Sequence, residues 1–329
     1  MATWSVKSSG WITTATLDNT PCTDGIDTIY VAQSVADIEE YTISINSATT
    51  IGNPTYWGSS GNAIGYPFMT YFDGNLYVLV ADSPNYKVMR HDGGTSWTTV
   101  QTISNSFGTG WALMSDGSRI VAILYGTVNN LTWSSANGTS WSQGTIAADI
   151  SVAIGLRPTR YQSSRCTIRP LMACLDTDWG GGAQRQSAWE HSGGTWTTKV
   201  SQSSPDFDFH IGDAIRNWQQ NGSNWEYTSD YSTWSGYAVP STNPTTYPLN
   251  GNDYTDSGIG FLAGTPSQIG FFDGDWSTIE SLGANNDRAY TALVMNDNRC
   301  FIPSRRSGGT VWDLFERSDV LPGDPIGPV

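Results

Sequence analysis

Carboxylates gather with a histidine in the segment PDFDFHIGD, near the middle of the chain. The segment contains Asp206, Asp208, His210 and Asp213, and Glu226 follows it. Paired carboxylates can hydrolyse glycosidic bonds, because one acts as an acid and the other as a base or nucleophile. Carboxylate oxygens also bind Ca²⁺, although this segment lacks the spacing of an EF-hand loop. Asp residues in loops far more often accept hydrogen bonds within turns, so we predict neither catalysis nor a metal site here.

Arginine is concentrated in the segment RPTRYQSSRCTIR, which holds Arg157, Arg160, Arg165 and Arg169. A guanidinium can clamp a carboxylate with two parallel hydrogen bonds, so such a group could bind an acidic substrate. Arginines confined to one segment more often form salt bridges or face water. We therefore expect a structural or solvated role for this group.

The rest of the sequence contains no complete catalytic motif. His91 and His191 occupy equivalent turn positions, and His210 stands apart, so the three histidines do not suggest a metal site. We find no G-x-S-x-G element, phosphate-binding loop or dinucleotide fingerprint. We predict that the chain is not an enzyme and carries no cofactor, and we keep glycoside hydrolysis as the only enzymatic alternative.

Aromatic residues with polar neighbours form the strongest candidate for a binding surface. They fall in long Gly-, Trp- and Asn-rich stretches between Gly155 and Asp256, and long loops on a rigid scaffold often carry binding. Flat rings beside amides suit sugar recognition, and they equally suit a protein interface or packing beneath their own loops. The residues of this predicted ligand or partner surface are Trp179, Trp218, Trp225, Tyr227, Tyr231, Trp234 and Tyr237.

A Gly-rich turn followed by tryptophan recurs along the chain and predicts the scaffold beneath these residues. The clear copies are HDGGTSW, ANGTSW, HSGGTW and RSGGTVW, with weaker ones ending at Trp11, Trp234 and Trp276. We expect these turn–Trp elements to be structural. Their Gly and Trp positions are Gly94, Trp97, Gly138, Trp141, Gly193, Trp196, Gly309 and Trp312.

Short hairpins precede several of these elements. An Asp-Gly pair separates apolar runs in MTYFDGNLYVLVA and WALMSDGSRIVAIL, and Asn-Asp-Asn does so in TALVMNDNRCFIP. Asp-Gly between alternating apolar residues is a strong hairpin signal, because the turn requires positive φ. Each unit then has four strands, which matches the blade of a β-propeller. The segment VAQSVADIEEY is the best helical candidate, yet we predict a hairpin there.

We predict an all-β fold, a β-propeller with seven four-stranded blades, and six as the alternative. The unit ends lie near Asn46, Trp97, Trp141, Trp196, Trp234, Trp276 and Trp312. We expect the first thirteen residues to supply a strand that closes the ring against the last blade, because an open ring leaves edge strands exposed. Residues 1–320 form one domain in this prediction, and 321–329, rich in Pro and Gly, form an extended tail.

The charge balance excludes several partners. The chain of 329 residues has a net charge of −14 and lacks the basic stripe that binds phosphates. We therefore expect no nucleic acid and no anionic membrane surface as partners. The N-terminal sequence lacks the features of a signal peptide, and no apolar run approaches the length of a membrane span.

The cysteines, Cys22, Cys166, Cys174 and Cys300, lack the spacing of a zinc site. Cys166 and Cys174 could face each other across a hairpin, and free buried thiols in a reducing compartment are the alternative.

The turn–Trp elements resemble the Asp-box of sialidase-like propellers, Ser-x-Asp-x-Gly-x-Thr/Ser-Trp. SSANGTSW matches at Ser134, Gly138, Ser140 and Trp141, with Ala136 at the Asp position. The resemblance implies a propeller in which these turns join outer strands away from any catalytic site.

Two further copies also match the Asp-box only in part. RHDGGTSW keeps Asp92, Gly94, Ser96 and Trp97, with Arg90 in the Ser place. RRSGGTVW keeps only Gly309 and Trp312, with Ser307 at the Asp position. The family's active site draws three arginines from separate blades and has an Arg-Ile-Pro motif near the first blade. The arginines of this chain fall in one unit and that motif is absent, so the resemblance extends to fold and not to sialidase chemistry.

Composition supports a functional hypothesis by association. Few lysines and hairpins rich in Ser, Thr, Asn, Gly and Trp resemble the decorating, tail and receptor-binding proteins of tailed bacteriophages. The hypothesis is a virion structural protein, made in the host cytoplasm, that contacts other virion proteins or a host surface glycan and can oligomerise within the assembly. The alternatives are a soluble glycan-binding propeller lectin and a sialidase-like glycoside hydrolase.

Overall fold

The computed structural model contains only β-strands as regular secondary structure among the residues that it describes. The described residues are 4–13, 21–32, 37–52, 54, 68–82, 84–104, 109–115, 118–125, 130–146, 156–157, 171–176, 186–192, 195–202, 207–212, 217–221, 224–228, 232–237, 260–263, 268–272, 278–282, 286–289, 293–295, 297, 299–306 and 309–319.

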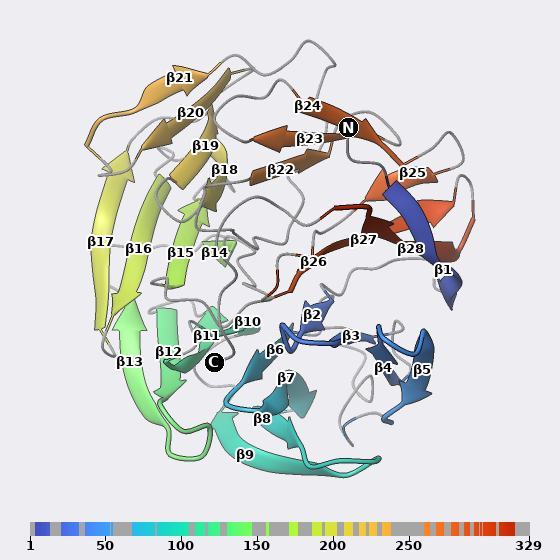
Figure 1. Ribbon diagram of the computed structural model, residues 1–329. Coiled ribbons are helices and arrows are strands. Elements are labelled where there is room, and N and C mark those ends of the chain that lie inside the picture. The colour runs from blue at the N-terminus through green and yellow to red at the C-terminus, as the bar shows by residue number, and fades with distance from the viewer. Residues whose placement is uncertain are drawn as a thin grey trace.

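The described strands form seven sheets that follow one another around a ring (Figure 1). The first sheet contains β2 (Cys22–Thr23), β3 (Thr28–Ala32), β4 (Ile38–Thr42) and β5 (Ser47–Thr50). The second contains β6 (Phe68–Phe72), β7 (Asn75–Asp82), β8 (Asn85–His91) and β9 (Trp97–Ser104). The third contains β10 (Thr109–Ser115), β11 (Ile120–Tyr125), β12 (Asn130–Ser135) and β13 (Ser142–Ile146).

The next three sheets continue the same antiparallel order. The fourth contains β14 (Leu156–Arg157), β15 (Leu171–Asp176), β16 (Gln186–Ser192) and β17 (Thr195–Gln202). The fifth contains β18 (Phe207–Gly212), β19 (Asn217–Asn221), β20 (Asn224–Thr228) and β21 (Ser235–Tyr237). The sixth has three described strands, β22 (Gly260–Ala263), β23 (Gln268–Phe272) and β24 (Thr278–Ser281).

The last sheet joins the two ends of the described chain. It contains β25 (Asn286–Ala289), β26 (Leu293–Val294), β27 (Cys300–Arg306) and β28 (Val311–Arg317), and its outer strand is β1 (Trp4–Thr13). β25 and β26 both pair with β27, so together they take the inner place. β1 pairs antiparallel with β28, which confirms that an N-terminal strand closes the ring.

The fold is a β-propeller, as predicted, and the described hairpins follow the predicted turns. Asp73 and Gly74 join β6 to β7 with φ of 47° and 76°, the left-handed values that a two-residue hairpin turn requires. The segment VAQSVADIEEY contributes strands β3 and β4 of one antiparallel pair rather than a helix. The blade number of the full chain and its division at residue 320 stay predictions, and residues 320–329 lie outside the described residues.

Apolar side chains fill the contacts between neighbouring sheets. One core cluster lies between the first and second sheets and contains Val78, Met89 and Ile38. Another lies between the second and third and contains Val88, Leu79 and Trp133. The sheets therefore hold each other through their faces.

Candidate functional site at the ring-closing seam

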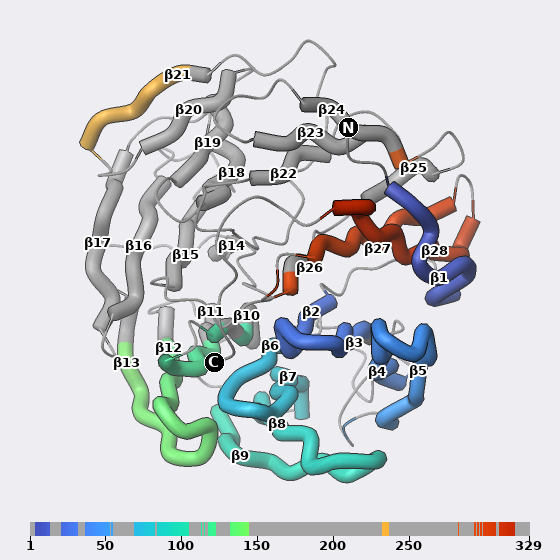
Figure 2. Tube along the Cα trace, in the orientation of Figure 1, coloured from blue at the N-terminus to red at the C-terminus, as the bar shows by residue number. Residues whose placement is uncertain are grey.

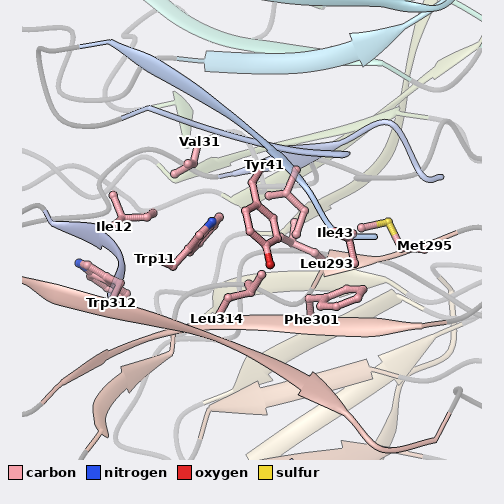
Figure 3. Packing of buried hydrophobic residues seen from close by; sticks show 11 residues of the cluster. Trp11, Ile12, Val31, Tyr41, Ile43, Leu293, Met295, Phe301, Trp312 and Leu314 are labelled. Atoms are coloured by element: carbon pink, nitrogen blue, oxygen red, sulfur yellow. The ribbon is translucent and has the colours of Figure 1, made fainter. Parts of the chain in front are cut away.

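We call the contact between the last sheet, in which β1 closes the ring by pairing with β28, and the first sheet the seam (Figure 2). A cluster of buried apolar residues fills it (Figure 3). Trp11 of β1 meets the edge of Tyr41 of β4 at 5.9 Å between ring centroids and an interplanar angle of 73°. The cluster is Trp11, Ile12, Ile29, Val31, Tyr41, Ile43, Leu293, Met295, Phe301, Trp312 and Leu314.

Asp313 of β28 holds the middle of β1 in place. Its Oδ1 accepts hydrogen bonds from the Gly10 backbone N–H at 2.7 Å and from Arg306 Nη2 at 2.7 Å, and its Oδ2 accepts from Arg306 Nε at 2.9 Å. Arg306 Nη2 also donates to Ser9 Oγ at 2.5 Å. The register of β1 against β28 shifts between Val6 and Ser8 and again between Ser8 and Ile12, so these side-chain bonds stand where regular pairing is interrupted.

Protonation of Asp313 is unfavourable in this setting. Burial raises the pKa of its carboxyl, but hydrogen bonds from Arg306, Gly10 and Ser9 and the charge of Arg306 outweigh that effect and lower it overall. The carboxylate therefore remains charged, which keeps the bidentate bond to Arg306 strong.

Tyr41 carries the polar network at one end of the seam. Its hydroxyl donates to Asn46 Oδ1 at 2.6 Å and is hydrogen-bonded to the Ser8 side chain of β1. Burial raises the pKa of Tyr41, and the negative charges of Glu316 and Asp27 raise it further, while the bond to Ser8 lowers it. The neutral phenol thus links the closing strand to the first sheet.

The turn between β2 and β3 is rigid because one side chain satisfies its backbone. Asp24 Oδ1 accepts hydrogen bonds from the backbone N–H groups of Ile26, Asp27 and Thr28 at 2.8, 3.0 and 2.9 Å. Thr23 Oγ1 donates to Thr28 O at 2.6 Å. This is an Asx-type turn, which a short carboxylate side chain favours.

The turn between β4 and β5 lies beside it at the same end of the first sheet. Asp27 Oδ1 accepts from the Ser44 backbone N–H at 3.0 Å, and Asp27 Oδ2 accepts from Ser44 Oγ. Asn46 has a positive φ of 50° and closes the turn. The two turns therefore form one fixed unit.

Arg299 ties this unit to the last sheet. Its Nη2 donates to Ile26 O at 3.0 Å, and its Nε donates to Asp297 Oδ2 at 2.7 Å. The guanidinium also lies 5.9 Å from the centroid of the Phe301 ring. The turn between β26 and β27 thus reaches across the seam to the turn between β2 and β3.

Large apolar side chains are exposed at this end of the ring. Ile26 is 58% exposed and Ile45 71%, and both lie on the turns of the first sheet described above. Val6 of β1 is 50% exposed and, opposite Phe315, lies on the other face of the last sheet; with it, these are the exposed large hydrophobic residues of the described part of the chain. Lys7, next to Val6, pairs with Glu316 at 3.6 Å, and Glu316 lies opposite Phe301 in the pairing of β28 with β27. We call this end the seam rim and define it as Lys7, Asp24, Ile26, Asp27, Ser44, Ile45, Asp297, Arg299 and Glu316.

The turn–Trp element of the second sheet packs against the first sheet. Trp97 Nε1 donates to Ile51 O at 3.3 Å. Thr95 lies so close to Gly52 that a Cβ there would be 3.3 Å from Thr95 Cβ. His91 lies opposite Trp97 in the register, with ring centroids 4.9 Å apart.

The turn–Trp element of the third sheet packs in the same way on the second. Trp141 is half-buried against the cluster that contains Tyr77 and Val88. A Cβ on Gly138 would lie 2.0 Å from Tyr77 Oη, so the turn touches Tyr77 directly. Each of these two turns therefore contacts the sheet that precedes its own.

The polar bonds of the two turns differ. Asn137 Oδ1 accepts from the backbone N–H groups of Thr139 and Ser140 at 3.0 and 2.8 Å, which explains why Ala136 is tolerated at the Asp position. Asp92 instead bonds Thr98 and Arg90, and these hydrogen bonds lower its pKa against the opposing effect of burial.

Trp312 occupies a different place from the other copies. The turn before it joins β27 to β28, the second and third strands of the last sheet from the centre. The equivalent turns before Trp97, Trp141 and Trp196 instead join the third strand of a sheet to the fourth, and each Trp lies at the start of that fourth strand. Trp312 is fully buried in the seam, facing the first sheet rather than the preceding one. Gly309 lies in its turn, while Gly193 lies outside the described residues.

The predicted aromatic surface falls mainly in the fifth sheet. Trp218 of β19 is opposite Tyr227 of β20, and Trp225 of β20 is opposite Tyr237 of β21. Because Trp225 and Tyr227 are two residues apart on one strand, the register places all four at positions of the same sheet face. Trp234 is half-buried before β21, and Trp179 and Tyr231 lie outside the described residues.

The other candidates for chemistry are only partly described. His210 of β18 is opposite Gln219, and Gln219 is opposite Glu226, so the backbone places these positions in one row across the fifth sheet. Asp208 is in β18 and Arg157 in β14. Outside the described residues lie Asp206, Asp213, Arg160, Arg165, Arg169 and Cys166.

Cys22 and Cys300 are buried and belong to no disulfide. Within the described ranges, no group of three or more His, Cys, Asp and Glu residues could hold a metal ion. Over the same ranges, no helix is long and apolar enough to cross a membrane.

Sequence reasoning missed the seam rim. The string CTDGIDT carries the signal of an Asx turn at Asp24 and an isoleucine where turns usually carry polar residues. The exposure of Ile26 and Ile45 follows only once the two turns are placed side by side.

No protein-family model matches the chain, and no curated protein matches it. Virginiamycin B lyase from Staphylococcus aureus is similar in structure, with a TM-score of 0.59, 9% identity, and coverage of 97% of this chain and 100% of that one. YCF48 bound to D1 peptide has a TM-score of 0.55, 13% identity, and coverage of 96% and 97%.

The β-propeller domain of the Trilobed protease from Pyrococcus furiosus has a TM-score of 0.53, 9% identity, and coverage of 91% and 92%. Its reported open velcro topology differs from the pairing of β1 with β28 in this chain. At such identities these likenesses show the fold alone, and that fold is the β-propeller.

Proposed function

We propose that this protein is a non-enzymatic interaction module that binds another protein through one end of its propeller. The observation that carries the proposal is the exposure of Ile26 and Ile45 at the seam rim, on two turns that the bonds between Asp27 and Ser44 hold together. Exposed apolar groups that gather at one place mark interaction sites more often than scattered ones do. YCF48, a propeller of similar structure, is described with a bound peptide, which supports the same use of the fold.

The finer proposal is a structural protein of a tailed bacteriophage virion, as a capsid decoration, tail or receptor-binding component. Composition supports it: few lysines, many Ser, Thr, Asn, Gly and Trp residues, and a net charge of −14. Its partners would then be other virion proteins or a host surface glycan. In this proposal residues 1–320 form the propeller and residues 321–329 a tail that contacts the assembly.

Cross-linking in particles tests this function. We expect the chain to co-purify with phage particles and to form cross-links to capsid or tail proteins that mass spectrometry can identify. A chain that is absent from particles refutes the virion proposal. A chain that is recovered only as a monomer, without any protein cross-link, refutes the interaction module as well.

A glycan-binding propeller is the second candidate. The observation that favours it is the register of the fifth sheet, which places Trp218, Trp225, Tyr227 and Tyr237 at positions of one face. Aromatic rings at the edge of such a face can stack on sugars. We expect binding on a glycan array that Trp225→Ala and Trp234→Ala abolish, and an array without signal would eliminate this candidate.

A further inference from the structure

We propose that the seam rim docks a protein segment that combines apolar side chains with an excess of Lys and Arg. This inference rests on the proposed interaction module and names the chemistry of its partner. It is carried by the apolar tips of two turns, by the rigid support beneath them and by the charges around them.

The fold does not require isoleucine at either tip. Turn positions favour Gly, Asn, Asp and Ser, because these residues adopt the needed backbone or bond to it. Here Asp24 and Asn46 meet those needs, whereas Ile26 and Ile45 are 58% and 71% exposed. Apolar side chains of this size gain free energy when a partner removes them from water. The rim therefore presents two apolar tips that burial within the chain does not explain.

The two turns that carry Ile26 and Ile45 are already ordered before a partner binds. Asp24 accepts three backbone N–H groups in the turn of Ile26, and Asp27 joins that turn to Ser44, next to Ile45. Arg299 fixes the Ile26 carbonyl to the last sheet at 3.0 Å. A surface that is already ordered loses little conformational entropy when it binds, so a short segment can bind it.

The charges of the seam rim indicate which kind of protein segment it can bind. The rim holds four carboxylates, Asp24, Asp27, Asp297 and Glu316, against two cations, Lys7 and Arg299, which leaves a local formal charge of −2. Both cations are paired, Lys7 with Glu316 at 3.6 Å and Arg299 with Asp297 at 2.7 Å. The carboxylates of Asp24 and Asp27 are thus the uncompensated charges, and both belong to the turn that carries Ile26.

The rest of the chain reinforces this selection, since its net charge is −14. Complementary charge steers association and rejects partners of like charge. An acidic or neutral apolar segment would bury Ile26 and Ile45 without this gain. A segment with Lys or Arg flanking its apolar residues fits both features of the rim.

Selection from a random peptide display library, with the full-length chain as bait, tests the proposal. We expect enriched peptides to combine apolar residues with net positive charge. Their affinity should fall by about tenfold or more in Ile26→Ser/Ile45→Ser, because a few central apolar residues dominate interfaces. It should also fall as NaCl rises from about 0.05 M to about 0.5 M, which screens the charges. The control Thr99→Ser/Thr102→Ser changes two exposed residues of β9 and should leave affinity unchanged.

Every outcome decides the proposal, provided that the unfolding midpoint of the double variant matches that of the parent chain. Peptides that bind Ile26→Ser/Ile45→Ser as well as the parent overturn the site. Rim-dependent peptides without net positive charge overturn the partner chemistry, and failure to enrich any peptide overturns both. If cross-linking in particles identifies a protein partner that contacts another surface, the interaction module stands and the docking proposal fails.

Discussion

Substituting Gly138 with alanine should destabilise the propeller far more than the same change at Gly94. Both glycines lie in turn–Trp elements and both have positive φ, 69° and 58°. A Cβ on Gly94 would meet nothing within 4 Å, whereas one on Gly138 would lie 2.0 Å from Tyr77 Oη and 2.7 Å from Tyr77 Cζ. The pair therefore separates the backbone effect from the contact with the preceding sheet.

The two costs can be worked out separately. A left-handed conformation costs a non-glycine residue about 1–2 kcal/mol, which is the full expectation for Gly94→Ala. In Gly138→Ala the Tyr77 hydroxyl must also retreat by 1.4 Å to reach the 3.4 Å of ordinary contact. Tyr77 is 1% exposed and cannot swing into water, so overpacking adds about 1–3 kcal/mol. We expect a total of about 2–5 kcal/mol for Gly138→Ala, from the sum of these two effects.

Urea unfolding followed by tryptophan fluorescence measures the difference between the two variants. A double-mutant cycle with Tyr77→Phe assigns it to the contact, because removal of the hydroxyl should recover part of the loss in Gly138→Ala and none in Gly94→Ala. The recovery should be incomplete, since the ring carbon would still lie 2.7 Å from the new Cβ. Equal free energies of unfolding for Gly138→Ala and Gly94→Ala would refute the direct contact between these sheets.

Three further predictions concern the seam. The pKa of Asp313 is lowered in the folded chain, so its contribution to stability is present above the pKa that this carboxyl has in the unfolded chain and is lost as pH falls below about 4. Asp313→Asn should therefore lower stability at neutral pH. In a plot of the unfolding midpoint against pH, the fall on the acid side should be shallower for this variant. Deletion of residues 1–13 should expose the β28 edge and cause concentration-dependent association in light scattering, whereas an unaltered monomer would contradict closure by β1. Trp312→Ala should lower the free energy of unfolding by about 3–5 kcal/mol in urea, because the Trp312 side chain is fully buried. Trp97→Ala should lower it by less, because Trp97 is half-buried. Equal losses in the two variants would contradict the different placement of these side chains.

The parts of the fold that sequence could predict are those that local chemistry decides. Asp73 and Gly74 adopt the positive φ that the Asp-Gly pair predicts, and the apolar runs on either side become β6 and β7. Ring closure could also be predicted, because an unpaired last sheet would expose an edge and residues 1–13 were the available strand. These inferences need only the short-range pattern and the rule that edges are covered.

The seam rim could not be predicted in this way. Ile26 and Ile45 are separated by a complete hairpin, and their turns come together through bonds to Asp27 from Ser44 and from the Ile43 backbone N–H. Arg299 reaches Ile26 from the far end of the sequence, a contact with no local signal. Trp312 shows the converse, since its local pattern matches Trp97 although β1 takes the outermost place in its sheet. In the last sheet, where the N-terminal strand supplies the outermost place, the turn–Trp repeat of the sequence no longer marks the same position in the structure.

The turn–Trp elements also show which parts of a short motif are physically fixed. Gly138 is required by the approach of Tyr77, and Trp141 packs against the cluster beneath it. The acceptor is not fixed in position, because Asn137 bonds the turn in one copy while Asp92 bonds Thr98 and Arg90 in another. Any nearby oxygen that reaches the donors suffices, whereas at Gly138 a side chain would collide with Tyr77 and at Gly94 only the positive φ favours glycine. Retention of glycine therefore follows from the turn's positive φ, and at Gly138 also from contact with the neighbouring sheet, while the acceptor is free to vary. A site that used the carboxylate for chemistry would instead retain the carboxylate.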